Sequence, residues 1–219
     1  MAPSAYISLV LDPTSKSALQ TCIDRIQSTS PVPLDPMSTL EMHMTLVFLG
    51  SNLRSLPPPK RTELDGIIAA FSTDVTTTTT AAAALEFNRL ELFPPTKRNL
   101  LVAMYKIGTG NLEALSRLQK ACLDLGVLSR EEHVKFEQGD FVAHVTLGKF
   151  RGMKAEQSTA VERVVNRVSE GLDESIVRSL GLPFNELCLR GADWERWYGK
   201  WRLDVEWEST IGTYIQYLG

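Results

Sequence analysis

His43-Met44-Thr45-Leu46 and His144-Val145-Thr146-Leu147 are two copies of one short motif, one in each half of the chain. Both copies belong to apolar, β-rich stretches, and we predict strands over His43 to Leu49 and Phe141 to Phe150. Because residues i and i+2 of a strand project from the same face, each histidine points the same way as its threonine. Each strand can therefore bury its apolar side chains on one face and present an imidazole and a hydroxyl on the other.

The segment before the first motif is a β-rich run from Tyr6 to Leu11 followed by a helix pattern. We expect Ser15 to cap this helix, which ends near Gln27. No basic residue precedes the apolar run, and Asp12-Pro13 ends it early, so we predict a strand and not a signal peptide. The apolar face of the helix consists of Leu19, Cys22, Ile23 and Ile26.

The segment before the second motif repeats this order. A strand over Leu100 to Tyr105 is followed by a turn at Gly108 to Gly110 and by a helix that Asn111 caps and that ends near Leu125. Its apolar face consists of Leu112, Leu115, Leu118 and Cys122. The repeated order of strand, helix and histidine strand predicts an internal duplication in which the two histidines hold equivalent positions.

The remaining segments add elements around this repeat. We predict a hairpin of Leu85 to Phe93 with Leu100 to Ile107 around the turn Pro94 to Lys97, and a strand's beginning near the Thr76 to Ala84 tract. Helices are expected over Pro59 to Phe71 and Ala155 to about Leu180, and a second hairpin over Pro183 to Arg190 with Lys200 to Trp207. The whole chain, 1–219, is predicted to be one bilobal α+β domain with antiparallel sheets flanked by helices.

Composition restricts the function classes. The formal charge of −3 gives no general attraction to nucleic acid, so we expect no long-duplex binding and no membrane association. The three cysteines, Cys22, Cys122 and Cys188, stand in no metal-ligand spacing, which favours reduced thiols in a cytoplasmic or nuclear protein. A monomer is the expected state.

The paired motifs suit phosphodiester chemistry. Cleavage needs one group that takes a proton from the attacking oxygen and another that gives a proton to the leaving oxygen, and two imidazoles can do both near pH 7. The hydroxyls of Thr45 and Thr146 can bind the non-bridging phosphate oxygens, and Lys149 can add a positive charge. This chemistry requires no metal and no cofactor.

The stretches 43–50 and 143–150, and Leu92-Phe93-Pro94-Pro95 with Lys97-Arg98 and the strand 100–103, resemble the 2H phosphoesterase superfamily. The resemblance is greatest to its RNA 2',5'-ligase/cyclic phosphodiesterase branch. It implies two α+β lobes related by a pseudo-twofold axis, with both motifs facing a central groove. It also implies that one histidine is the general base and the other the general acid, with Thr45 and Thr146 on the phosphate.

Two positions depart from that family's pattern. Ala143 stands before the second histidine where many relatives have proline, and Lys149 stands where arginine is frequent. A lysine meets a phosphate as a point charge and lacks the two-pronged contact that a guanidinium makes.

Three functions remain open from the residues. The first is a metal-independent phosphodiesterase that hydrolyses 2',3'-cyclic phosphates or 2',5'-linked and RNA-end phosphodiesters, with His144 favoured as base and His43 as acid. The second is a nucleotide- or RNA-end-binding module without catalysis. The third, a zinc hydrolase, lacks a third ligand beside either motif.

Two further features are expected to be structural. His133 has no following threonine and stands in a polar stretch, so we expect it on the surface. The C-terminal segment is rich in tryptophan, whose rings can stack a base but more often pack a sheet. These residues are Trp194, Trp197, Trp201 and Trp207.

Overall fold

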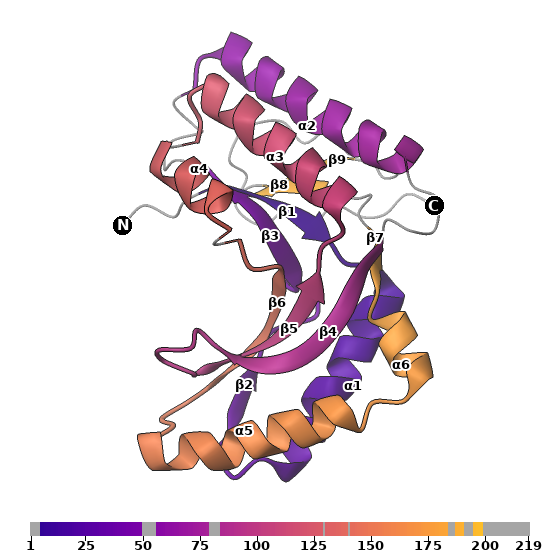
Figure 1. Cartoon of the computed structure of the whole chain (residues 1–219), viewed down its shortest axis with the longest axis vertical. Helices are drawn as coiled ribbons and strands as arrows, with labels where there is room; N and C mark the ends of the chain where they lie inside the picture. Colours follow the sequence, from indigo (N-terminus) through magenta and orange to yellow (C-terminus); the bar gives the residue numbers. More distant parts are fainter. Residues whose placement is uncertain are drawn as a thin grey trace.

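The computed structural model describes residues 5–49, 56–78, 84–128, 130–139, 141–183, 187–190 and 195–198. They form an α+β fold in which helices flank an antiparallel sheet (Figure 1). The strands are β1 (Tyr6–Val10), β2 (Leu34–Pro36), β3 (His43–Phe48), β4 (Ala84–Phe93), β5 (Leu100–Lys106), β6 (His144–Phe150), β7 (Leu182–Pro183), β8 (Leu187–Arg190) and β9 (Glu195–Tyr198). The helices are α1 (Pro13–Thr29), α2 (Pro58–Thr78), α3 (Thr109–Asp124), α4 (Arg130–Glu137), α5 (Ala155–Glu170) and α6 (Glu174–Ser179).

The two histidine strands are neighbours in the middle of the sheet. The strand order among the described residues is β7-β4-β5-β6-β3-β1-β8-β9, and β2 also pairs with β6. The predicted repeat is visible in this order, because β1 and β3 of the first half mirror β5 and β6 of the second. The pseudo-twofold axis therefore passes between β3 and β6, close to the pair formed by Met44 and Val145.

The two halves also share an irregularity of register. Thr45 pairs with Ser8 and Val47 with Ile7, so the ladder skips Leu46. In the second half, Thr146 pairs with Val102 and Gly148 with Leu101, so the ladder skips Leu147. An extra residue at the same place in both ladders supports the internal duplication more strongly than the tetrapeptides do.

The helices are exchanged between the halves. Although α1 follows β1, it packs against α5, α6, β2 and β6, whereas α3 follows β5 and packs against α2 and α4. Figure 1 shows α2 and α3 beside the part of the sheet that contains β1, β3 and β8, and α1, α5 and α6 beside β4. α1 thus lies over strands of the second half of the sequence, and α3 lies beside strands of the first.

Three predicted helix boundaries were wrong. Asp12, not Ser15, caps α1, because its carboxylate accepts the backbone N–H groups of Thr14 and Ser15 at 2.8 and 3.0 Å. Asn111 lies inside α3, whose cap is Gly108. The single helix predicted over Ala155 to Leu180 is two helices, since α5 ends at the cap Gly171 and Asp173 starts α6.

Other differences concern what surrounds these helices. The loops expected before the histidine strands contain the short elements β2 and α4. α2 continues past Phe71 to Thr78, so part of the threonine tract is helical and β4 begins at Ala84. The strand that pairs with β8 is β9, and residues 199–219, where the prediction placed that partner, lie outside the described residues together with Trp194.

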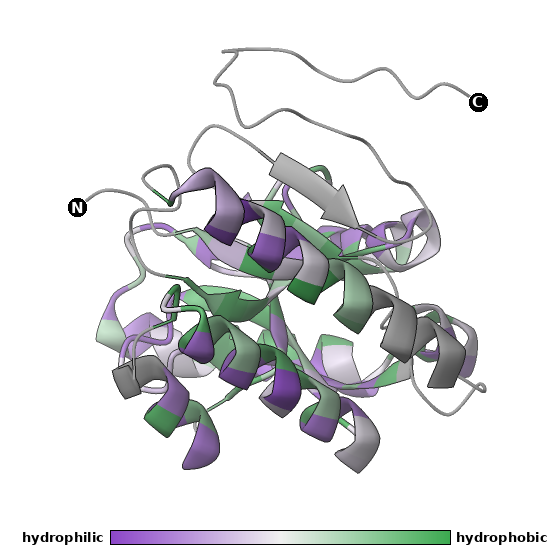
Figure 2. Ribbon diagram, turned by 90° about the horizontal axis from the view of Figure 1, so that it is seen from above, coloured by the Kyte–Doolittle hydropathy of each residue, from purple (hydrophilic) through white to green (hydrophobic). Residues whose placement is uncertain are grey.

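The core contains most of the predicted apolar residues. Leu19, Cys22, Ile23 and Ile26 of α1 are all buried, but Leu112 of α3 is 43% exposed, so only the later part of that predicted stripe is correct. Figure 2 shows the central strands mostly in green between helices with purple on their outer sides. None of the described helices is long and apolar enough to cross a bilayer.

The cysteines are part of this core. All three thiols are buried. Burial raises the pKa of Cys22 to about 11 and that of Cys122 to about 12. Both thiols therefore stay protonated near neutral pH, and their role is to fill space.

A glycine allows β2 to approach β6. A Cβ atom at Gly148 would lie 2.7 Å from the backbone oxygen of Asp35 and 3.1 Å from the Cα atom of Pro36. Because backbone atoms cannot move aside as a flexible side chain can, only glycine fits here without a shift.

Gly148→Ala should therefore destabilise the protein, by about 1–3 kcal/mol from overpacking. Urea unfolding measures this change. Gly66→Ala in α2 is the matched control, because a Cβ atom there meets nothing within 4 Å and alanine favours helix. Equal midpoints for Gly148→Ala and the unsubstituted protein would contradict the close approach.

Candidate active site

The four predicted motif residues lie on one face of the central sheet, which we call the histidine face. His43, Thr45, His144 and Thr146 are all partly exposed. The residues that alternate with them point into the core, and each is at most 2% exposed: Met44, Leu46, Val145 and Leu147. The alternation inferred from the two motifs is thus confirmed in both strands.

The register of β3 and β6 brings the two motifs together. Met44 is paired with Val145 in an antiparallel ladder, so His43 falls across from Thr146 and Thr45 across from His144. Side chains directly opposite in such a pair have Cβ atoms about 5 Å apart, and diagonal neighbours about 7–8 Å apart. The two histidines occupy a diagonal, which leaves room for one phosphate between their rings.

The two imidazoles are anchored in the same way. Nδ1 of His43 lies 2.6 Å from the carbonyl oxygen of Glu41, and Nδ1 of His144 lies 2.8 Å from that of Val142. A carbonyl oxygen can only accept a hydrogen bond, so Nδ1 carries the proton in each ring. In the neutral form Nε2 then holds the lone pair, which is the arrangement that a general base requires.

An aromatic ring packs on each histidine, but the two rings come from different places. Tyr6 of β1 stacks on His43 with ring centroids 5.0 Å apart and planes at 18°. Phe93 of β4 lies 5.0 Å from His144 with planes at 32°. The register makes Leu100 the equivalent of Tyr6, so the two histidine environments are not copies of each other.

The shared bulge decides which residues follow the threonines on the histidine face. In an uninterrupted strand Lys149 would point away from His144, because it stands five positions later. The extra residue at Leu147 reverses the alternation, so Gly148 is buried and Lys149 is exposed on the face of the histidine. Phe48, which is 56% exposed, takes the same position after His43.

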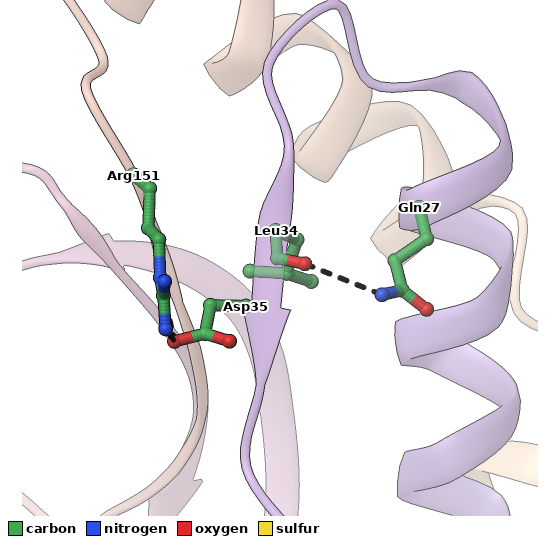
Figure 3. A network of polar contacts seen from close by, with 4 residues as sticks. All are labelled: Gln27, Leu34, Asp35 and Arg151. Atoms are coloured by element: carbon green, nitrogen blue, oxygen red, sulfur yellow. Dashed lines mark hydrogen bonds and ion pairs between the residues drawn. The ribbon is translucent and has the colours of Figure 1, made fainter.

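A neighbouring ion pair leaves the charge of Lys149 available. Asp35 of β2 pairs with Lys149 across the strands, but its Oδ2 accepts hydrogen bonds from Nε and Nη2 of Arg151 at 2.9 and 2.6 Å (Figure 3). Figure 3 also shows Gln27 donating to the carbonyl oxygen of Leu34, which ties β2 to α1. Within the described part of the chain, no carboxylate forms an ion pair with Lys149.

Sequence reasoning missed the rings and misplaced one histidine. The motif spacing contains no signal for Tyr6 or Phe48, although Phe93 belongs to a turn that the resemblance had singled out. His133 is not a surface residue, since its side chain is only 12% exposed and Nε2 lies 3.4 Å from Oε1 of Glu137. The described side chains contain no cluster of three His, Cys, Asp or Glu that could hold a metal ion.

The predicted central groove stays a prediction. Two hollows outlined by described residues lie elsewhere, one between α1 and α6 and the other between α3 and α4.

Comparison with known proteins identifies the fold. No protein-family model and no curated protein matches the sequence. Among solved structures, Usb1 of Kluyveromyces marxianus with uridine monophosphate superimposes with a TM-score of 0.52 at 9% identity, covering 90% of this chain and 98% of that chain. A second structure of the same protein gives 0.51 at 10% identity with the same coverage. The chain has the fold of these two structures.

A further solved structure is E. coli LigT complexed with 3'-AMP, which has a TM-score of 0.46 at 13% identity and covers 93% of this chain and 98% of that chain. In this chain the two histidine strands lie side by side at the centre of the sheet. The order β5-β6-β3-β1 provides this arrangement.

The carbonyl anchors predict a tautomer. When their rings are neutral, both His43 and His144 should carry the proton on Nδ1, because the backbone carbonyl oxygens of Glu41 and Val142 can only accept a hydrogen bond. Nitrogen chemical shifts of 15N-labelled imidazoles above pH 8 measure this directly. A proton on Nε2 in either ring would contradict the anchored geometry.

Proposed function

We propose that this protein is a metal-independent phosphodiesterase that hydrolyses 2',3'-cyclic phosphates or 2',5'-linked and RNA-end phosphodiesters with His43 and His144 as acid–base pair. The observation that carries this proposal is the diagonal arrangement of the two imidazoles. In each ring a carbonyl oxygen accepts the Nδ1 hydrogen bond, and a threonine stands across the ladder from each histidine. Acid–base catalysis needs two such proton-transfer groups, one on each side of the phosphorus atom.

The reaction on a 2',3'-cyclic phosphate has one step. Nε2 of the base takes a proton from water, the water oxygen bonds to phosphorus, and the bond from phosphorus to O3' breaks. The acid gives its proton to O3', which leaves a 2'-phosphate. In cleavage of a 2',5' linkage the base takes the proton of the neighbouring 3'-hydroxyl, whose oxygen bonds to phosphorus. The bond from phosphorus to O5' breaks and the acid protonates O5', which leaves a 2',3'-cyclic phosphate.

The rings around the site favour one order of roles. Tyr6 presents its face to His43 in a nearly parallel stack, and an aromatic face stabilises a cation above it. His43 is therefore assigned as the acid, which begins the reaction as imidazolium, and His144 as the base. Thr45, Thr146 and Lys149 bind the non-bridging oxygens and their developing charge.

The substrate class is a small nucleotide or an RNA end. Phe48 is exposed on the histidine face, and its ring lies 6.3 Å from that of Tyr6, so the two can hold a base by stacking. That the Usb1 structure contains uridine monophosphate supports a nucleotide here. The protein is proposed to act as a monomer in the cytosol or nucleus.

His43→Ala and His144→Ala should each lower turnover of a 2',3'-cyclic mononucleotide by about 10²–10⁴-fold, because each variant lacks one proton-transfer group. The assay is run with a chelator and over a pH series, in which the unsubstituted protein should give a bell-shaped profile. His133→Ala, in α4 and outside both motifs, is the control. Full activity of either motif variant refutes the assignment. Retained nucleotide affinity with no turnover of any substrate by the unsubstituted protein favours the binding module.

Thr45→Val and Thr146→Val should lower kcat on the order of 10²-fold, because valine keeps the shape of threonine and removes the hydroxyl that binds the phosphate. Thr45→Ser and Thr146→Ser, which keep the hydroxyl, are the matched variants and should recover most of the activity. Equal losses for valine and serine would mean that the methyl group matters and the hydroxyl does not.

A further inference from the structure

A third bulge lies in β4, two strands from His144. Phe87 pairs with Tyr105 and Arg89 pairs with Met104, so Asn88 is skipped. Phe87 and Leu90 are buried, whereas Arg89 is exposed. The extra residue therefore turns Arg89 onto the face that carries Met104, where an uninterrupted strand would have placed Asn88.

The register places Arg89 level with His144. Met104 pairs with Arg89 on one side and with His144 on the other, so the three residues form a row across β4, β5 and β6 on the histidine face. Two strand spacings separate the outer members, which is about 10 Å between Cα atoms. An arginine side chain covers much of that distance, so its guanidinium can reach a substrate that lies beside His144.

A carboxylate holds this guanidinium. Oε2 of Glu91 accepts a hydrogen bond from Nε of Arg89 at 2.9 Å and lies 2.7 Å from Nη2. Among the described contacts no carboxylate lies against Nη1 of Arg89, so the N–H groups of Nη1 are available to an anion. Glu91 therefore fixes the plane of the guanidinium without using all its donors.

Arg89 and Lys149 lie far apart on the histidine face. Lys149 pairs with Leu100 of β5, and Arg89 pairs with Met104 of the same strand. These two positions are four residues (104 − 100), or about 13 Å, apart along β5. Thr146 pairs with Val102, between these two positions, and His144 pairs with Met104, level with Arg89. One phosphate between the histidines cannot lie next to both cations, whereas a substrate with two phosphates can use both.

We propose that Arg89, oriented by Glu91, binds a second phosphate of the substrate, the internucleotide phosphate next to the reacting one. The site then prefers RNA ends of two or more nucleotides to a mononucleotide cyclic phosphate. This inference rests on the proposed function, whose substrate class it narrows. Arg89 is a binding residue in it, and Glu91 is a positioning residue.

The test compares two substrates, adenosine 2',3'-cyclic phosphate and the dinucleotide ApA with a 2',3'-cyclic phosphate end. The ratio of kcat/KM for the dinucleotide to that for the mononucleotide should fall about tenfold or more in Arg89→Met, because this variant loses a hydrogen bond between charged groups. Arg89→Lys should recover part of the ratio, and Glu91→Gln should lower it less than Arg89→Met does.

Arg98→Met is the matched control. Nη1 of Arg98 lies 2.9 Å from Oε2 of Glu162, but this pair joins the turn of the hairpin to α5, and its loss should leave the ratio as it is. An unchanged ratio in Arg89→Met, or an equal fall in Arg98→Met, would overturn the proposal.

A binding titration separates this inference from the proposed function. If the unsubstituted protein turns over neither substrate, the proposed function fails, and the affinities for 2'-AMP and for ApA with a 2'-phosphate end still decide the role of Arg89. Arg89→Met should then lower the affinity for the dinucleotide about tenfold relative to the affinity for 2'-AMP. It should also reduce the slope of log affinity against log salt concentration by about 0.7, the value for one phosphate contact on a single strand. Equal salt slopes in the two proteins would refute the contact.

Discussion

The pairing of β3 with β6 at Met44 and Val145 is the contact on which the rest of the site depends. It joins the two halves of the chain into one sheet, and it buries the apolar residues of both motifs in a common core. Because the pairing is antiparallel, it sets each histidine across from the threonine of the other motif. A shift of this register by one residue would turn one motif into the core and separate the four side chains.

The bulges in β3 and β6 decide which side chains join the histidines on the histidine face. Strict alternation would offer only every second residue to the histidine face, and the residues five positions after the histidines would be buried. The skipped residues Leu46 and Leu147 change the phase of both strands at the same point, which brings Phe48 and Lys149 to the outside. The duplication therefore supplies equivalent positions, and the different side chains at them, an aromatic ring and a cation, make the two ends of the site unlike.

The exchange of helices explains why the halves depend on each other. α1 covers strands of the second half, and α3 packs with α2 beside the first. Because α1 and α3 each lie beside strands of the other half, the two halves share one core. The short β2 adds to this, since it lies against β6 through Gly148 and is held by Arg151 and Gln27.

The sequence alone determined the elements whose signals are local. The alternation of His43 to Leu46 and of His144 to Leu147, the repeated order around them and the hairpin before β6 all follow from side-chain periodicity and turn residues. Tertiary structure decided the rest. The neighbours of the histidines, Tyr6 and Phe93, and the face on which Lys149 and Arg89 emerge depend on strand register and bulges. These are set by pairing between distant segments, which no local pattern encodes.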